Sequence, residues 1–281
     1  MDVLKGIAEE TRALLLKRVV DRYFDEISQY VVQLWLILSE EPLQFRPHAS
    51  AVLVEMNGRK YLLTAGHVLD DIDLKYLCFF ENDDLVKVQG EVTYLSNKVK
   101  ENINGDIAAY LLEDENAAEL SKHYKFLPFD RVLMNHLLSR EPRYFIVGYP
   151  VSQSKKWFQK KIIRINSLRF NTRGIIDSKK MKRLGLDPQV NFMVEFHRRK
   201  CSNLWDVKNQ KQYLPAPNGL SGAALWYIDD DKVMKLVGIM TGYNFVETVM
   251  TASRIDLATE MIRHRFDHSV EKTRVINVKW D

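Results

Sequence analysis

The feature that most constrains the fold is a series of short apolar and β-branched runs separated by turn residues. Asn57-Gly58 stands between SAVLVEM and KYLLTAG, and such a pair between apolar runs is the strongest short-range signal for a β-hairpin. Further runs are VVQLWLILS, LKYLCFF, LVKVQGEVTYL, DIAAYLL, RYFIVGYP, KIIRINSLRF, VNFMVEF, GAALWYI, KLVGIMTG and NFVETVMTA. About a dozen closely spaced strands predict an all-β, antiparallel barrel or sandwich and argue against a βαβ fold.

Helical periodicity is confined to three segments. In the first 30 residues an apolar stripe predicts an amphipathic helix that packs across a barrel or docks on a partner chain. Residues 114–125 predict a short helical connector, and the segment after Ser253 predicts a closing helix with Ser253 as its N-cap. The members of the first stripe are Leu4, Ile7, Ala8, Leu15, Val19 and Tyr23.

Composition and charge indicate an ordinary globular chain. The 281 residues, 46% hydrophobic and 28% charged, suffice for one large or two small domains and are unlike a disordered or fibrous protein. The 41 basic and 37 acidic residues give a net charge of +4, which does not by itself indicate nucleic acid. Basic residues surround Trp157, Phe158 and Phe170, as in stacking platforms for nucleic acid, but no recognised motif accompanies them. We therefore expect a solvated surface there.

Cysteine usage and the N-terminal residues bear on location. Two cysteines, Cys78 and Cys201, are few for a secreted protein of this size, which more often carries several disulfides. The segment MDVLKGIAEETRALLLKRVV is charged throughout and lacks the apolar core of a signal peptide. No run approaches the roughly 18 apolar residues of a membrane span. These features predict a cytoplasmic protein that does not enter a membrane.

The first motif, LLTAGHVL at residues 62–69, places His67 directly after a strand that ends in small residues. Small residues let the backbone turn sharply and leave room for a partner against the imidazole. Histidine is the usual general base near neutral pH, so His67 is a candidate catalyst. Taken alone, a histidine at a strand end is more often a structural residue.

The second motif, NINGDIAAYLLE at residues 102–113, places Asp106 between a turn at Asn104-Gly105 and an apolar strand. An Asp beside a turn commonly caps that turn, and this interpretation is favoured when the motif stands alone. The functional interpretation is a carboxylate that orients an imidazole and stabilises the imidazolium.

The third motif, PAPNGLSGAALW at residues 215–226, places Ser221 between Gly219 and Gly222, just before an apolar strand. Glycines let the backbone adopt conformations closed to other residues and let a substrate carbonyl come close. The backbone N–H groups of Gly219 and Ser221 would then form an oxyanion hole. For the tetrapeptide GLSG alone, a Gly-rich hairpin turn is an equally good interpretation.

Together, TAGH, a Gly-Asp pair before a strand, NGLSG and the downstream strand KLVGIMTGY resemble the trypsin-like (chymotrypsin-fold, clan PA) serine peptidases. Their catalytic residues follow the order His, Asp, Ser. The chain is most similar to the bacterial intracellular and high-temperature-requirement-type branches, whose histidine motif is often TAGHV. An α/β-hydrolase is excluded because the histidine comes first, strands surround Ser221, and Ala223 replaces a required glycine.

The resemblance spans roughly residues 48–252 and implies two antiparallel six-stranded β-barrels, with an N-terminal amphipathic helix and a C-terminal helix added. Residues 1–30 would form the helical extension and 31–281 the peptidase domain. Within that domain we expect the first barrel at 31–125, the second at 140–253, and a C-terminal helix and tail at 254–281.

The resemblance also implies a serine endopeptidase that needs no metal or cofactor. Ser221 would attack the carbonyl of a protein or peptide substrate, His67 would transfer the proton, and Asp106 would orient His67. The amides of Gly219 and Ser221 would bind the oxyanion.

Substrate recognition is expected at two places. The segment Met240, Thr241, Gly242 and Tyr243 resembles the strand that pairs with the substrate backbone. The pocket for the side chain before the scissile bond would come from residues 214–218 and 241–244, which contain no Asp or Glu. We therefore expect a small or apolar side chain in it, and not Lys or Arg.

Departures from the family pattern bear on regulation. Leu220 stands where extracellular trypsins carry an Asp that pairs with a freed N-terminus, so activation by N-terminal insertion is not expected. The long segment at 151–190 is expected to hold an extra hairpin. This segment and the first helix offer surfaces for an activating protein partner. The alternative is a catalytically silent barrel that acts as a protein-interaction module.

Overall fold

The computed structural model describes residue 15 and residues 17–81, 84–95, 105–157, 162–164, 166–197 and 214–276. The predictions for the helical residues 1–14, for Asn104, for Phe158 and for Cys201 lie outside the described residues.

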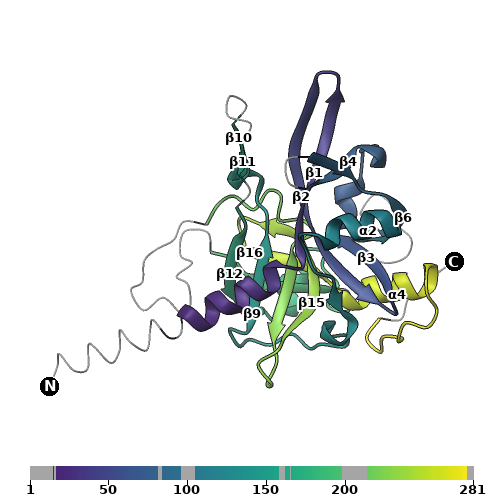
Figure 1. Cartoon of the computed structure of the whole chain (residues 1–281). Helices are drawn as coiled ribbons and strands as arrows, with labels where there is room; N and C mark the ends of the chain where they lie inside the picture. Colours follow the sequence, from purple (N-terminus) through teal and green to yellow (C-terminus); the bar gives the residue numbers. More distant parts are fainter. Residues whose placement is uncertain are drawn as a thin grey trace.

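Two antiparallel β-sheets lie side by side and form the body of the molecule (Figure 1). In the first sheet, seven strands follow the spatial order β5-β4-β1-β2-β3-β7-β6, and the short β8 pairs in parallel with β2. The strands are β1 (Val31–Glu40), β2 (Leu43–Met56), β3 (Arg59–Thr64), β4 (Leu77–Glu81), β5 (Asp84–Lys87), β6 (Gly90–Leu95), β7 (Ile107–Leu112) and β8 (Leu127–Pro128).

The second sheet has six strands in the order β12-β9-β14-β15-β16-β13. After β12, a bridge between Gly174 and Val194 ties the chain to β13, so the two edges of this sheet meet. Its strands are β9 (Tyr144–Gly148), β12 (Leu168–Thr172), β13 (Asn191–Glu195), β14 (Ala224–Ile228), β15 (Met234–Asn244) and β16 (Val249–Arg254). A separate hairpin, β10 (Lys155–Trp157) and β11 (Ile162–Arg164), occupies part of the 151–190 segment, where the sequence predicts one.

The all-β, antiparallel, two-unit architecture is confirmed, but the prediction of six strands in each unit is wrong for the first one. That sheet gains the parallel β8 beside β2 and the edge strand β5 beside β4. Its edge strands, β5 and β6, share no ladder within the described residues, so it is an open sheet there. The reason is local: β8 is only two residues long, too short for a hydropathy signal, and β5 and β6 both lie along the single run LVKVQGEVTYL, so counting runs gives too few strands.

The β2–β3 hairpin forms where the Asn57-Gly58 pair predicts it. Val52 to Met56 pair with Leu63 to Arg59, and both turn residues have positive φ, 51° at Asn57 and 76° at Gly58. This backbone matches the type I′ turn, whose twist suits the flanking strands.

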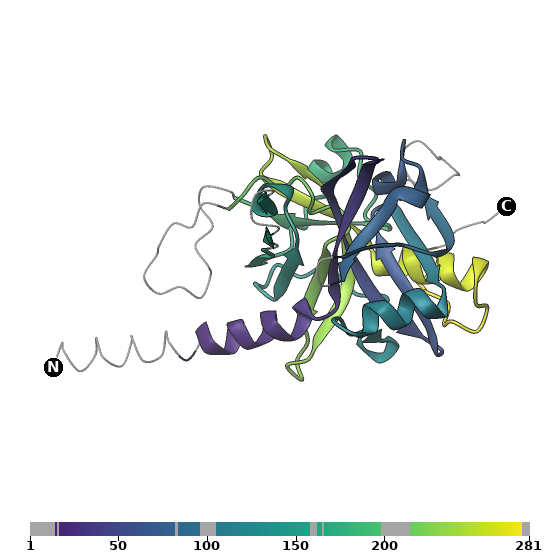
Figure 2. The same cartoon turned by 45° about the horizontal axis from the view of Figure 1, so that its top comes forward.

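Helices cap the sheets at the two ends of the chain (Figures 1 and 2). A helix over 17–28 lies along the second sheet, and α4 (Ile255–Arg265), on the other side of the molecule, packs against β7 of the first sheet and β15 of the second. Within the described part of the chain, no helix is long and apolar enough to cross a membrane. The remaining helices are α2 (Asp114–Ser121) and the unexpected α3 (Ser178–Arg183).

The first helix buries a different stripe from the predicted one. Leu15 and Val19 are exposed, although Tyr23 of the predicted stripe packs partly buried against the core. The fully packed positions are Val20, Phe24 and Ile27. The ring of Phe24 lies edge-on to Phe145 of β9, 5.4 Å between centroids. Residues that start one position later thus face the sheet, because the stripe is chosen by the docking surface and not by hydropathy alone.

The N-cap prediction for α4 is also wrong. Arg254 occupies that position without a side-chain cap, and Ser253 lies within β16, one residue before its end.

Strands at the junction of the two sheets are buried on both faces, which explains their uninterrupted apolar runs. In β14, Ala224 and Trp226 face the core between the sheets, while Leu225 faces the interior of the second sheet. In β2, Val52 and Val54 face the same junction core. A strand covered on both sides needs no polar alternation. The candidate motifs all lie at this junction.

Candidate active site

His67 follows β3 in a short 3₁₀ turn, Gly66–Leu69. A Cβ on Gly66 would lie 1.8 Å from the carbonyl oxygen of Leu95, so only glycine fits before the histidine. The small residues of TAGH therefore serve the close approach that the sequence predicts. This close contact fixes the path of the backbone before His67 and therefore the position of His67.

Asp106 lies directly before β7 and is held by Ser253, which the sequence analysis selected only as a helix N-cap. The hydroxyl of Ser253 donates to the carbonyl of Asp106 at 2.9 Å and lies 3.3 Å from its amide nitrogen, which donates to it. Ser253 is fully buried near the end of β16. A lone serine beside an apolar run gives no sequence signal for this role, because the contact spans 147 residues of chain.

The structure brings His67, Asp106 and Ser221 into one hydrogen-bonded chain. The Nδ1 atom of His67 lies 2.7 Å from Oδ2 of Asp106, and Nε2 lies 2.9 Å from Oγ of Ser221. The backbone N–H of His67 donates to Oδ1 of Asp106 at 2.8 Å. The His67 side chain is 37% exposed and that of Asp106 14%, so the imidazole is open to a ligand while the carboxylate is shielded.

The protonation of His67 is set by opposing effects. Burial lowers its pKa, but the hydrogen bond that the imidazole donates to Asp106, the charge of Asp106 and the charge of Asp70 together raise the pKa above the ordinary value of 6.5. Burial lowers the pKa of the neighbouring His48, whose Nε2 lies 2.8 Å from the carbonyl oxygen of Val68. The two histidines therefore differ in their readiness to take up a proton.

The Ser221 loop has the backbone that its glycines suggest. Gly219 has φ +90° and Gly222 has φ +84°, both in the left-handed region. A Cβ on Gly222 would lie 1.8 Å from the carbonyl oxygen of Ser50, on β2 of the other sheet. The nucleophile candidate thus stands where the two sheets touch.

Two amides beside Ser221 are free to bind a ligand. In the part of the chain that the structure describes, the N–H groups of Gly219 and Ser221 donate to no protein acceptor. The neighbouring amides are engaged, since Leu220 donates to Pro217 and Gly222 donates to Met240, at 2.9 and 2.8 Å. Two free donors on either side of Leu220 suit a developing negative charge on an oxygen.

A cavity of about 150 Å³ opens beside Ser221. Its side-chain walls are mainly apolar, and no charged residue lines it. The lining residues are Pro217, Asn218, Leu220, Ser221, Met240, Gly242, Tyr243, Phe245 and Met250. Three of the four residues of the predicted substrate strand are among them, and Phe245 and Met250 are additions that the sequence analysis missed.

The strand next to the cavity has one open edge. Met240 donates to Ala223 and accepts from Gly222, so its backbone groups are already paired and it contributes its side chain to the cavity. Beyond it, the ladder to β14 has ended while β15 still pairs with β16. Thr241 lies outside the cavity lining, and its hydroxyl contacts that of Thr251 at 3.2 Å. Among the described residues, Thr241 and Gly242 have no strand partner on the β14 side and can accept an added strand there.

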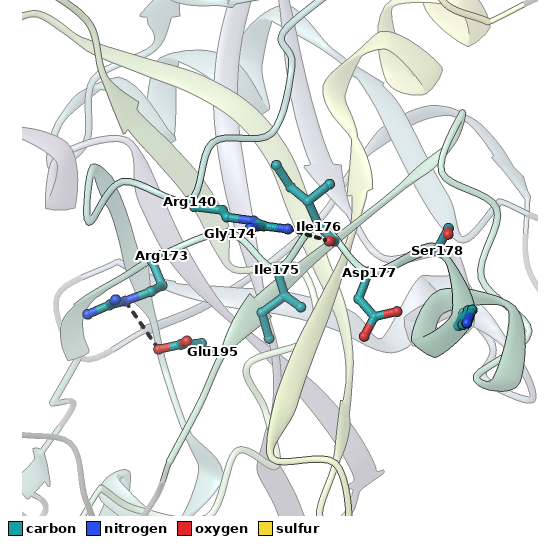
Figure 3. A pocket seen from close by; sticks show the side chains of 9 residues that line it. Arg140, Arg173, Gly174, Ile175, Ile176, Asp177, Ser178 and Glu195 are labelled. Atoms are coloured by element: carbon teal, nitrogen blue, oxygen red, sulfur yellow. Dashed lines mark hydrogen bonds and ion pairs between the residues drawn. The ribbon is translucent and has the colours of Figure 1, made fainter.

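A larger depression of about 610 Å³ lies between the β12 end and α3 (Figure 3). Several of its charged groups contact the protein itself: Arg173 pairs with Glu195 at 3.3 Å, and Arg140 donates to the carbonyl of Ile176 at 3.2 Å. Asp177 caps α3 through the amide of Lys180. None of the predicted site residues lies there, and we assign it no function.

No cluster of side chains that could hold a metal ion occurs among the residues described.

Comparison with known proteins identifies the fold. No family model matches the chain, and no curated protein matches it. Two inactivated protease paralogues of the scabies mite are 14% and 11% identical, each with a TM-score of 0.51. They cover 85% and 88% of this chain and 96% and 95% of their own.

The VesB protease of Vibrio cholerae is 12% identical with a TM-score of 0.50, covering 85% of this chain and 64% of that protein. These likenesses show a chymotrypsin-like fold, as the motifs predict. The high-temperature-requirement-type branch stays a prediction, and function has to be argued from the site.

Proposed function

We propose that the chain is a serine endopeptidase that hydrolyses peptide bonds through an acyl-enzyme. The observation that carries this proposal is an unbroken series of two hydrogen bonds. Ser221 Oγ lies 2.9 Å from His67 Nε2, and His67 Nδ1 lies 2.7 Å from Asp106 Oδ2. A nucleophile, a base and an orienting carboxylate in this order form a general solution to acyl transfer. No metal or cofactor takes part.

The mechanism follows from the proton positions. With Nδ1 protonated and donating to Asp106, Nε2 accepts the Ser221 proton as Oγ attacks the substrate carbonyl. The carbonyl oxygen becomes negative and moves onto the amides of Gly219 and Ser221, a type of contact worth a few kcal/mol of barrier for each donor. His67 then protonates the leaving amine, and water repeats the sequence to release the acyl group.

The apolar cavity supports a preference for a small or medium apolar side chain before the scissile bond. Its volume of about 150 Å³ and the walls from Met240, Tyr243 and Met250 offer no counter-charge for Lys or Arg. Digestion of a peptide library should therefore give cleavage after residues such as Ala, Val, Leu or Met. Cleavage mainly after Lys or Arg would contradict this preference.

Regulation by a protein partner is part of the proposal. Leu15 and Val19 of the first helix are 56% and 51% exposed and face away from the sheet that the helix covers.

The free thiol of Cys78 is buried, and burial raises its pKa to about 12, so it takes no part in the chemistry. We retain the cytoplasm as the proposed location, from the cysteine count.

The test is labelling with a serine-directed fluorophosphonate. The wild-type chain should be labelled, and both Ser221→Ala and His67→Ala should abolish labelling because one removes the nucleophile and the other its base. Well-folded wild-type protein that is not labelled would instead indicate a silent barrel, the alternative in which this fold serves as a protein-interaction module.

A further inference from the structure

A single buried hydroxyl connects the first sheet to the loop that would form the oxyanion hole. Ser50 lies on β2 and has no exposed surface. Its Oγ accepts from the amide of Tyr149 at 2.8 Å and donates to the carbonyl of Gly219 at 2.9 Å. The hydroxyl therefore uses its proton on one loop and a lone pair on another.

The two peptide planes on either side of Gly219 are each held by one hydrogen bond. The carbonyl of Asn218 accepts from the amide of Val151 at 2.7 Å, and the carbonyl of Gly219 accepts from Ser50 Oγ. In a trans peptide the N–H and C=O groups point in opposite directions. Holding the Asn218 carbonyl against Val151 directs the Gly219 amide the other way, where it is free to bind a ligand.

Ser50 is itself held firmly. Its backbone N–H donates to the carbonyl of Ser221 at 2.9 Å, and its carbonyl accepts from the hydroxyl of Thr64 at 2.8 Å. Ser50 therefore binds the loop on both sides of Leu220: its hydroxyl bonds to Gly219 and its backbone N–H bonds to Ser221. Leu220 is buried in the apolar interior of the second sheet and offers no charge for fixing the loop.

We propose that Ser50 is a positioning residue that holds the 217–221 loop with the Gly219 amide directed at the oxyanion site. This inference rests on the proposed peptidase function. The loop is then preset by a contact within the domain, with no need for a charged group inserted from elsewhere. Ser50 touches no substrate and acts only through the orientation of Gly219.

Ser50→Ala removes the bond without adding bulk, and Thr172→Val is the matched control. Thr172 is buried, and its hydroxyl donates to the carbonyl of Glu195 at 2.7 Å within the second sheet. Both variants lose a buried hydroxyl that donates to a backbone carbonyl, and Ser50→Ala also removes the acceptor of the Tyr149 amide, so its loss of stability is expected to be the larger of the two. Only Ser50→Ala should change the loop.

A spectroscopic measurement reports the loop independently of activity. With ¹⁵N-glycine and ¹³C-carbonyl asparagine, only the Asn-Gly pairs at 57–58, 104–105 and 218–219 give doubly labelled amides. In Ser50→Ala the Gly219 signal should shift or broaden, whereas the Gly58 signal stays in place. Thr172→Val should leave both unchanged.

The kinetic measurement separates positioning from general stability. Ser50→Ala should lower kcat for a peptide substrate by about 10- to 100-fold with KM changed less than about threefold, because the bond acts on the transition state. The affinity for a peptide boronate, whose tetrahedral adduct places an oxygen in the hole, should fall in parallel. Thr172→Val should keep both values near those of the wild type.

These measurements distinguish a failure of the Ser50 proposal from a failure of the proposed peptidase function. Wild-type protein that reacts with a fluorophosphonate, together with a Ser50→Ala variant whose Gly219 signal, kcat and boronate affinity are unchanged, would overturn the role of Ser50 and leave the peptidase function standing. Folded wild-type protein that does not react at all would overturn both.

Discussion

One carboxylate holds His67 at two points. Oδ1 of Asp106 accepts from the backbone N–H of His67 at 2.8 Å while Oδ2 contacts Nδ1 at 2.7 Å. Asp106 is in turn tied to Ser253 through its own backbone N–H and C=O. The position and the tautomer of the imidazole are thus decided together, by a residue 39 positions along the chain.

Replacing this carboxylate should remove activity and move its pH dependence. Asp106 raises the pKa of His67 above 6.5, and the base must be neutral, so wild-type kcat/KM should fall as pH drops through a value above 6.5. Asp106→Asn should lower kcat/KM by roughly 10⁴-fold and move this acid limb to lower pH. A pH profile of peptide hydrolysis measures both effects.

Asp70→Asn is the control for charge alone. Asp70 also raises the pKa of His67, but less than Asp106 does, so the acid limb should move slightly and the plateau should stay near that of the wild type. An Asp106→Asn variant with the limb and plateau of Asp70→Asn would contradict the orienting role.

Gly222→Ala should destabilise the junction between the sheets. The added Cβ would lie 1.8 Å from the Ser50 carbonyl oxygen at a residue with φ +84°. We expect a loss of roughly 2–4 kcal/mol from overpacking and backbone strain together. Gly185→Ala, with φ +69° and nothing within 4 Å of the added Cβ, should lose only about 1 kcal/mol. Denaturant unfolding compares them, and equal losses would refute the close contact.

Phe245→Ala should weaken the binding of apolar substrates. Phe245 lines the cavity beside Ser221, and its ring lies 4.4 Å from that of Tyr243. Removing this wall should raise KM by about fivefold, equivalent to about 1 kcal/mol of apolar contact, with little change in kcat. The adjacent Val246 is 91% exposed and lies outside the lining, so Val246→Ala should leave KM unchanged. The same rise in both variants would count against the cavity as the substrate pocket.

Phe24→Ala tests whether the first helix belongs to the folded domain. Phe24 is 4% exposed and packs on Phe145, so its removal should cost roughly 3–4 kcal/mol. Val19→Ala, at an exposed position of the same helix, should change stability by less than about 0.5 kcal/mol. Thermal unfolding distinguishes a docked helix from one that is independent of the sheets, for which neither change would matter.

Much of the strand pattern could be read from local chemistry. The Asn57-Gly58 turn forms as predicted because its positive φ values suit these two residues. Sequence signals were weaker for elements that are stabilised mainly by packing against their neighbours. The stripe of the first helix was wrong by one position, and α3 and β8 gave no hydropathy signal, because neighbours and not periodicity stabilise them.

By itself, the sequence determined which residues could do chemistry: His67, Asp106 and Ser221 each lie at the end of a strand, and small residues or turns mark these ends. Their distances and the two free amides were decided by the tertiary structure, as were the support from Ser253 and Ser50 and the walls from Phe245 and Met250. These contacts join segments up to 169 residues apart. Hydrogen bonds and close packing depend on distance in space, and neither composition nor spacing along the chain encodes that distance.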